Sequence, residues 1–275
     1  MTVAINLVVP DGIIYAADSR ETYTNARGDV RVGSDHAHKV FQLGPRIGAV
    51  TWGWAFLCGR NIHSHVNDFV VSQSGKNRTI EETAKDLGQY FTEQYQKHIK
   101  GGGRPVEPNL YALGFLVGGF DQGNQSGKVF EVQIPQISES NFRLIRTTDT
   151  SPGAGWRGNT LAISRLMKGF DPRIFELSGA TPELRKNLDE AKLDYNLNYW
   201  ALTSQDAVDL AIFLAHTTIQ MLRFSDGIRM APGDSANCGG PIDVAVIDPR
   251  DGFVWVQRKT LRGERVSAGA TISET

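Results

Sequence analysis

The apolar positions of the first twenty residues follow the pattern of two β-strands. Residues 3–9 and 13–17 are apolar runs rich in β-branched side chains, and a Pro10-Asp11-Gly12 turn separates them. Two such runs joined by a short Asp-Gly turn predict a β-hairpin. The hairpin would place Thr2 beside Asp18, the acidic residue that follows the second run.

The rest of the chain alternates between strand and helix spacing. Thr79 and Glu82 form a capping-box pattern, which predicts that a helix begins there and ends at Gly101. The other expected helices are 57–72, 160–168 and 204–224, and the other expected strands are 39–43, 47–52, 109–121, 128–135, 141–147, 242–247 and 253–256. This order of strands, two helices, strands, two helices and strands predicts an α+β fold in which helix pairs cover two antiparallel sheets.

We expect a single domain over residues 1–275. Residues 171–199 are polar, charged and weakly periodic, so they are interpreted as a surface insertion, and a loose polar tail is expected from about residue 263. The glycine-rich residues 153–158 are expected to form a loop.

Composition and charge argue against several functions. A net charge of −1, with basic residues scattered along the chain, gives no electrostatic basis for binding nucleic acid or a membrane. No apolar run approaches the ~20 residues of a membrane span, and no leader peptide is recognised, so a cytoplasmic location is expected. Cys58 and Cys238 lie outside any metal or redox motif, and we expect no metal and no cofactor.

Thr2 is the first candidate for chemistry. If Met1 is removed, the hydroxyl nucleophile and a base, the α-amino group, belong to one residue. An α-amino group has a pKa of roughly 8, so part of it is neutral near pH 7 and can accept the hydroxyl proton. Lys39 opens an apolar strand and would favour the reactive forms by its charge, while Asp18 would hold that ammonium in place.

Four segments resemble the proteasome β-subunit family of N-terminal-nucleophile hydrolases, in a bacterial form. They are Thr2 with Asp11-Gly12 to Arg20, His38-Lys39-Val40-Phe41-Gln42, Gly53, and the run from Asp234 to Ile247. The resemblance implies a four-layer αββα sandwich and a threonine-type peptidase that acts on peptides or proteins through an acyl-enzyme. It also implies a homo-oligomeric ring or stack; the sequence does not indicate whether an ATPase partner exists.

The resemblance also implies roles for individual residues. Thr2 would be the nucleophile, Asp18 and Lys39 its charged partners, Gly53 an oxyanion donor, and Asp234 a group that orients the Thr2 amine. The chain departs from the family where Ala154 replaces a serine and where Asn237 or Cys238 replaces another. The segment between Arg20 and Lys39 is also longer.

Four residues are expected to contact substrate. Strand alternation places Thr51, Gly53 and Ala55 on one face, so Thr51 and Ala55 would flank the pocket, while Trp52 and Trp54 would face the core or helices. Thr22 would hold an extended peptide by strand addition. The resemblance places Glu21 in the specificity pocket, which suggests a preference for basic side chains.

Three alternatives to a peptidase remain open. The chain could hydrolyse a small amide, or it could be a catalytically weakened structural homologue, as Ala154 suggests. A third alternative is a dinucleotide-binding protein, because residues 153–158 match GxGxxG. That motif needs a strand directly before it and a βαβ unit, which the surrounding pattern does not provide.

Overall fold

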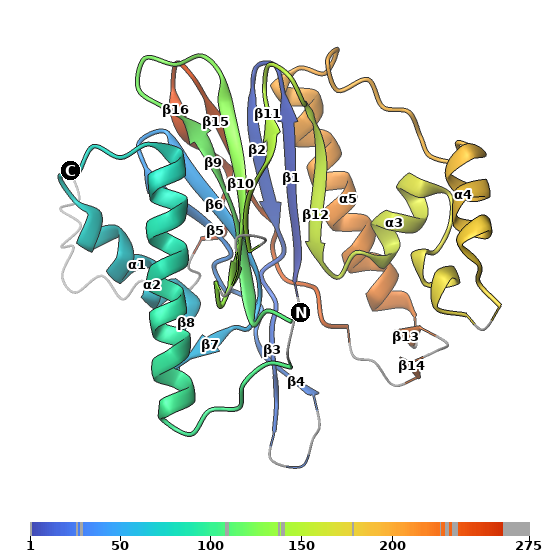
Figure 1. Ribbon diagram of the computed structural model, residues 1–275, viewed down its shortest axis with the longest axis horizontal. Helices are drawn as coiled ribbons and strands as arrows, with labels where there is room; N and C mark the ends of the chain where they lie inside the picture. Colours follow the sequence, from blue (N-terminus) through green and yellow to red (C-terminus); the bar gives the residue numbers. More distant parts are fainter. Residues whose placement is uncertain are drawn as a thin grey trace, which may run out of the picture.

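The fold is described from a computed structural model of the chain (Figure 1). It describes residues 2–25, 27, 30–107, 110–136, 138, 141–177, 179–225, 227–228, 231–232 and 236–260. The predicted loose tail and Asp234 lie outside these residues. In the described part of the chain, no helix is long and apolar enough to cross a membrane.

Two five-stranded antiparallel sheets form the centre of the molecule. The first has the order β12-β1-β2-β15-β16, and the second the order β11-β10-β9-β6-β5. The strands of the first are β12 (Gly153–Gly158), β1 (Val3–Val9), β2 (Gly12–Ala17), β15 (Asp243–Asp248) and β16 (Gly252–Gln257). Those of the second are β11 (Phe142–Thr147), β10 (Gly127–Ile134), β9 (Leu113–Phe120), β6 (Ile47–Gly53) and β5 (Val40–Gly44).

The predicted N-terminal hairpin is confirmed. In β1 and β2, Ala4 lies opposite Ala17 and Val9 opposite Gly12, and every residue of both strands is buried. Both faces are buried because apolar clusters lie on either side of the strands. Val8 and Tyr15 pack toward the second sheet, whereas alternate residues such as Ile5 pack toward helices.

Helices cover the outer faces of these sheets (Figure 1). Their bounds are α1 (Ile62–Gln73), α2 (Ile80–Lys100), α3 (Leu161–Lys168), α4 (Pro182–Glu190) and α5 (Ser204–Phe224). α1 and α2 share a core cluster with the second sheet, and α3 and α5 share one with the first. The Thr79–Glu82 capping box begins α2 as predicted.

The expected four-layer sandwich is wrong as a description of the fold. The described residues form five antiparallel sheets rather than two, because three two-stranded ribbons add to the large sheets. These ribbons are β3 (Glu21–Thr24) with β4 (Val30–Ser34), β7 (Phe56–Leu57) with β8 (Arg60–Asn61), and β13 (Gly227–Ile228) with β14 (Ala231–Pro232). The five helices also do not form two pairs, since α4 lies outside α3 and α5 (Figure 1).

One segment differs from its predicted structure. Residues 153–158 form the edge strand β12, antiparallel to β1, and not a loop. Glycines hide the strand period there, and a Cβ at Gly155 would lie 2.4 Å from the Asn6 amide oxygen, so the Asn6 side chain would have to shift. The GxGxxG match therefore does not form a phosphate-binding turn. The predicted insertion contains a short 3-10 helix (Pro172–Glu176) and α4, which lies beside α3 (Figure 1).

A buried carboxylate connects the two large sheets. Glu131 of β10 is 1% exposed and accepts hydrogen bonds from Arg157 of β12 and Arg143 of β11, each at 2.5 Å in its shortest contact. Burial alone would raise the pKa of Glu131, but the two guanidinium groups outweigh it and lower the pKa below the ordinary 4.5. The ionised Glu131 with its two arginines therefore stabilises the fold at neutral pH. This contribution is lost as the pH falls below 4.5, the ordinary pKa of a glutamate, and through the lowered pKa of Glu131.

We predict that Glu131→Gln lowers the free energy of unfolding by about 2 kcal/mol, because it removes the charged hydrogen-bond partner of two arginines that remain partly exposed to water. Urea denaturation at pH 7 measures this. Glu190→Gln is the matched control, since Glu190 pairs with Lys186 in solvent and its loss should cost less than about 1 kcal/mol. Equal effects of the two substitutions would contradict the prediction.

Candidate functional site

An ion pair between Asp18 and Lys39 lies at the centre of the candidate site. Asp18 follows β2, Lys39 precedes β5, and the Lys39 Nζ lies 2.9 Å from the Asp18 Oδ1. The two side chains are 0% and 5% exposed. The Lys39 ammonium also donates to the carbonyl oxygen of Arg20 at 2.5 Å. Two sheets thus meet at a buried charge pair.

Three backbone N–H groups complete the environment of Asp18. Val3 donates to Oδ1 at 3.0 Å, and Gly239 and Arg20 donate to Oδ2 at 2.9 and 3.2 Å. A buried carboxylate is tolerated in a folded protein when hydrogen bonds satisfy its oxygen atoms in this way. Because Val3 is one donor, the contact also fixes the chain directly after Thr2.

Thr2 is held beside this pair. It is 5% exposed, and its carbonyl oxygen accepts a hydrogen bond from the Asn159 N–H at 2.6 Å. The Asn159 side chain donates in turn to the Asn237 amide oxygen at 3.1 Å. Thr2 is therefore held by Asn159 in the loop after β12, while Asp18 holds the next residue, Val3.

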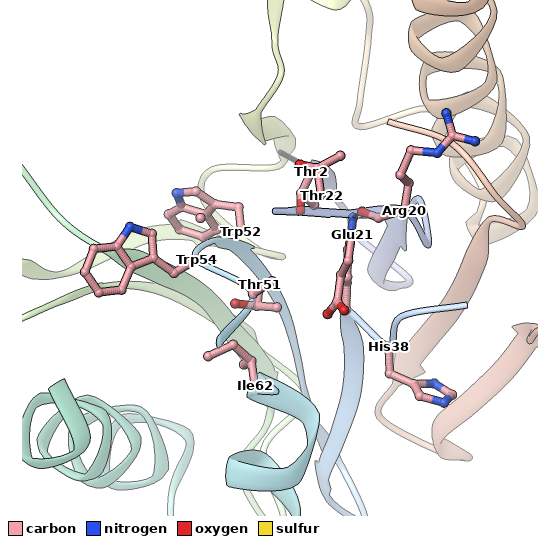
Figure 2. A pocket seen from close by; sticks show the side chains of 12 residues that line it. Thr2, Arg20, Glu21, Thr22, His38, Thr51, Trp52, Trp54 and Ile62 are labelled. Atoms are coloured by element: carbon pink, nitrogen blue, oxygen red, sulfur yellow. Dashed lines mark hydrogen bonds between the residues drawn. The ribbon is translucent and has the colours of Figure 1, made fainter. Parts of the chain in front are cut away.

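A single pocket collects most of the residues predicted from the sequence (Figure 2). Thr2, Lys39 and Gly53 line it, together with all four expected substrate residues, namely Glu21, Thr22, Thr51 and Ala55. Asp18 does not line the pocket, but its carboxylate accepts a hydrogen bond from the Lys39 ammonium, which does. The remaining residues of the lining are Arg20, His38, Trp52, Trp54 and Ile62.

Gly53 occupies a position that only glycine tolerates. Its φ of 99° lies in the left-handed region, and an added Cβ would lie 2.5 Å from the carbonyl oxygen of Ala112. The strand β6 ends at Gly53 and does not reach Ala55, but Thr51, Gly53 and Ala55 all line the pocket. Trp52 lies in a buried core cluster and Trp54 packs against the cluster that includes α1 and α2, as expected, and both also line the pocket.

Arg20 has a role that the sequence did not reveal. Its guanidinium binds both carboxylate oxygens of Asp35, at 2.6 and 2.9 Å, and donates to the carbonyl oxygen of Ala236 at 2.8 Å. Its own backbone contacts Asp18 and Lys39. Arg20 therefore joins the ion pair to two loops that are distant in sequence, and only its position two residues after Asp18 could have indicated this.

A second buried ion pair lies behind the pocket. Lys259 pairs with Asp243, which lies opposite Ala17 in the first sheet, and their side chains are 4% and 2% exposed.

The His38 ring is 4.4 Å from the His63 ring, centre to centre. Burial, with the charges of Lys259 and neighbouring groups, lowers the pKa of His38 to about 4. His38 is therefore uncharged at neutral pH.

The thiol of Cys238 is a poor nucleophile. Cys238 is 1% exposed, and burial raises the pKa of its thiol far above the ordinary 9.0. The neighbouring Asn237 is 2% exposed, and its Nδ2 lacks a hydrogen-bond partner within the described residues. Thr2 lines the pocket, whereas Cys238 does not. Among the described residues, no group of three or more metal-ligating side chains gathers at one place.

Known structures share the fold of this chain at low sequence identity. No family model matches the sequence, and no curated protein matches it. The chain is similar to a solved structure titled "Anbu (Gly-1) mutant from Hyphomicrobium sp. strain MC1", with 18% sequence identity and a TM-score of 0.51. The match covers 94% of this chain and 86% of that chain. At this identity, the likeness shows a common fold.

The expected membership of the proteasome β-subunit family is wrong. No family model supports it, and a solved structure that resembles the chain carries a different name, Anbu. The segments that suggested the family are short and lie at a turn, at strand ends and in buried strands. A common fold is enough to place such residues at similar positions.

We predict that Gly239→Ala destabilises the protein by about 2 kcal/mol, because the new Cβ would lie 2.7 Å from the guanidinium carbon of Arg20. That guanidinium cannot move aside without leaving Asp35 or Ala236. Gly44→Ala is the control, since its Cβ would meet Ile47 at an ordinary 3.7 Å. Urea denaturation of both variants tests this, and indistinguishable unfolding midpoints would contradict it.

Proposed function

We propose that this chain is an N-terminal-threonine peptidase, in which Thr2 becomes the nucleophile once Met1 has been removed. The observation that carries the proposal is the buried Asp18–Lys39 pair, whose ammonium lines the same pocket as Thr2. A cation beside the nucleophile stabilises the anion that forms as its hydroxyl loses a proton.

In the proposed reaction, Thr2 Oγ forms a bond to the carbonyl carbon of the substrate. The hydroxyl proton passes to the α-amino group of Thr2 and then to the departing amine, so the peptide C–N bond breaks and an ester remains on Thr2. Water then attacks the ester, and its proton passes through the same amine to Thr2 Oγ. This second step releases the acid and restores the free threonine.

Gly53 is the proposed oxyanion donor. Its left-handed backbone ends β6 at the pocket, and the absence of a side chain lets a carbonyl oxygen approach the N–H group. One such donor typically stabilises the transition state by about 3–4 kcal/mol. Asp234, proposed to orient the Thr2 amine, lies outside the described residues.

We predict that Thr2→Ala abolishes peptide hydrolysis, whereas Thr2→Ser retains it, because serine keeps both the hydroxyl and the α-amino group. Hydrolysis of a mixed fluorogenic peptide library measures this, after intact mass has shown that Met1 is absent. Lys39→Met should lower the rate by about 10²–10⁴-fold. Lys85→Met is the control, since Lys85 pairs with Glu81 in solvent.

The variants also separate the alternatives. Hydrolysis of small amides, with no peptide cleaved, would indicate the amidohydrolase. Retained Met1, or activity that survives Thr2→Ala, would contradict the proposal. Because Lys39→Met leaves Asp18 buried without its partner, the double variant Asp18→Asn/Lys39→Met removes both charges. A folded but inactive double variant would support a catalytic role for the pair.

A further inference from the structure

A second pair of opposite charges is buried beside the Asp18–Lys39 pair. Asp243 begins β15 and lies opposite Ala17 of β2, the residue that precedes Asp18. Residues that lie opposite each other in an antiparallel pair project to the same face, and Ala17 belongs to the core cluster that the two large sheets share. The Asp243 carboxylate therefore faces the space between the sheets, at the end where Asp18 and Lys39 meet.

The chain at the end of β16 supplies the cation of this second pair. Residues 257–260, called the strap below, run along the start of β15. The Gln257 side chain donates to the carbonyl oxygen of Ile242 at 2.8 Å, and the Lys259 N–H donates to the Asp243 Oδ1 at 2.9 Å. The Lys259 ammonium binds the other carboxylate oxygen, Oδ2. The strap thus holds the segment that follows Gly239, whose N–H donates to Asp18.

The two ion pairs are close enough for their charges to act on each other. Burial lowers the pKa of Lys259 below the ordinary 10.5, Asp243 opposes this effect, and the charge of Lys39 adds to it. His38, which precedes Lys39 in the chain, is subject to the charges of both Lys259 and Asp243. Two ammonium groups and two carboxylates are therefore buried together, and each ammonium is bound to one carboxylate.

This arrangement is sensitive to the loss of one cation. A buried carboxylate is strongly unfavourable without a cation to compensate it. Without Lys259, the Asp243 carboxylate would attract the other ammonium of the cluster, that of Lys39. The Lys39 side chain would then leave Asp18 and the pocket that it shares with Thr2. With Lys259 in place, Asp243 is satisfied and Lys39 remains with Asp18.

We infer that Lys259 is a positioning residue for the reaction at Thr2. By holding Asp243, it keeps the Lys39 ammonium bound to Asp18 and inside the pocket. Lys259 does not line the pocket itself and acts through these side chains. The inference rests on the proposed function for its effect on the rate. Its effect on the hydrogen bonds of Asp18 does not depend on any reaction and is measured separately.

Two variants separate competition by Asp243 from a general loss of packing. Lys259→Met leaves Asp243 without a cation, so kcat for peptide hydrolysis should fall about 10- to 100-fold, with KM changed less than about twofold, because the ammonium is misplaced while the pocket remains. The double variant Asp243→Asn/Lys259→Met also lacks the competing carboxylate and should recover most of that rate. A purely structural role would leave the double variant at least as slow as the single one.

Hydrogen exchange, followed residue by residue, tests the positioning without turnover. The N–H groups of Val3 and Gly239 donate to Asp18, so Lys259→Met should speed their exchange about 10-fold, and the double variant should restore it. Lys186→Met is the matched control, since Lys186 pairs with Glu190 in solvent, and it should change neither rate. If Lys259→Met does not fold, Lys259→Gln, which keeps a donor but not the charge, takes its place.

The two measurements decide between the outcomes. Wild-type exchange at Val3 and Gly239 in the folded Lys259 variant would overturn the inference, even if the protein cleaves peptides. A double variant with a kcat as low as that of the single variant would overturn it as well. Faster exchange that the double variant restores, in a protein that cleaves no peptide, would uphold the positioning of the Asp18–Lys39 pair and overturn the proposed function instead.

Discussion

The structure depends on keeping two opposite charges buried at the meeting point of its sheets. Removing a carboxylate and an ammonium from water costs several kcal/mol for each, and the attraction between them compensates only when further hydrogen bonds satisfy both. Asp18 receives three backbone donors besides Lys39, and the Lys39 ammonium has a second acceptor in the Arg20 carbonyl. Strand β1, strand β2 and the loop at Gly239 must all be in place for this to hold, so the fold and the site are stabilised together.

The same constraint explains why the pocket forms where it does. The donors to Asp18 fix Val3, and the ammonium fixes the start of β5, so Thr2 and Lys39 are brought to one cavity from different sheets. Arg20 extends the network to Asp35 and Ala236. Two cations of the pocket lining, Lys39 and Arg20, are therefore held by carboxylates of the chain itself.

The sequence predicted those features that short-range patterns encode. The apolar period of α5, the capping box of α2 and the Asp-Gly turn of the first hairpin each depend on residues a few positions apart. The hairpin then placed Thr2 near Asp18. The β3–β4 ribbon and β12 were missed because polar residues and glycines hide the strand period there. Two contacts could not be predicted because they join segments that are distant in sequence. They are the hydrogen bond from Arg20 to the carbonyl oxygen of Ala236 and the Lys259–Asp243 ion pair. The family was misassigned because short motifs at turns and strand ends follow from the fold, and a common fold does not establish membership of one family.

The central claim is that Thr2, freed of Met1 and placed beside the Asp18–Lys39 pair, is the nucleophile. The most direct measurement treats the purified protein with an electrophile that must bond the hydroxyl and the amine of one residue, and identifies the adduct by mass spectrometry of its peptides. We expect one adduct per chain, on Thr2, and none in the folded Asp18→Asn/Lys39→Met double variant. A folded protein with a free Thr2 amine that forms no adduct, or forms it equally without the ion pair, would contradict the account.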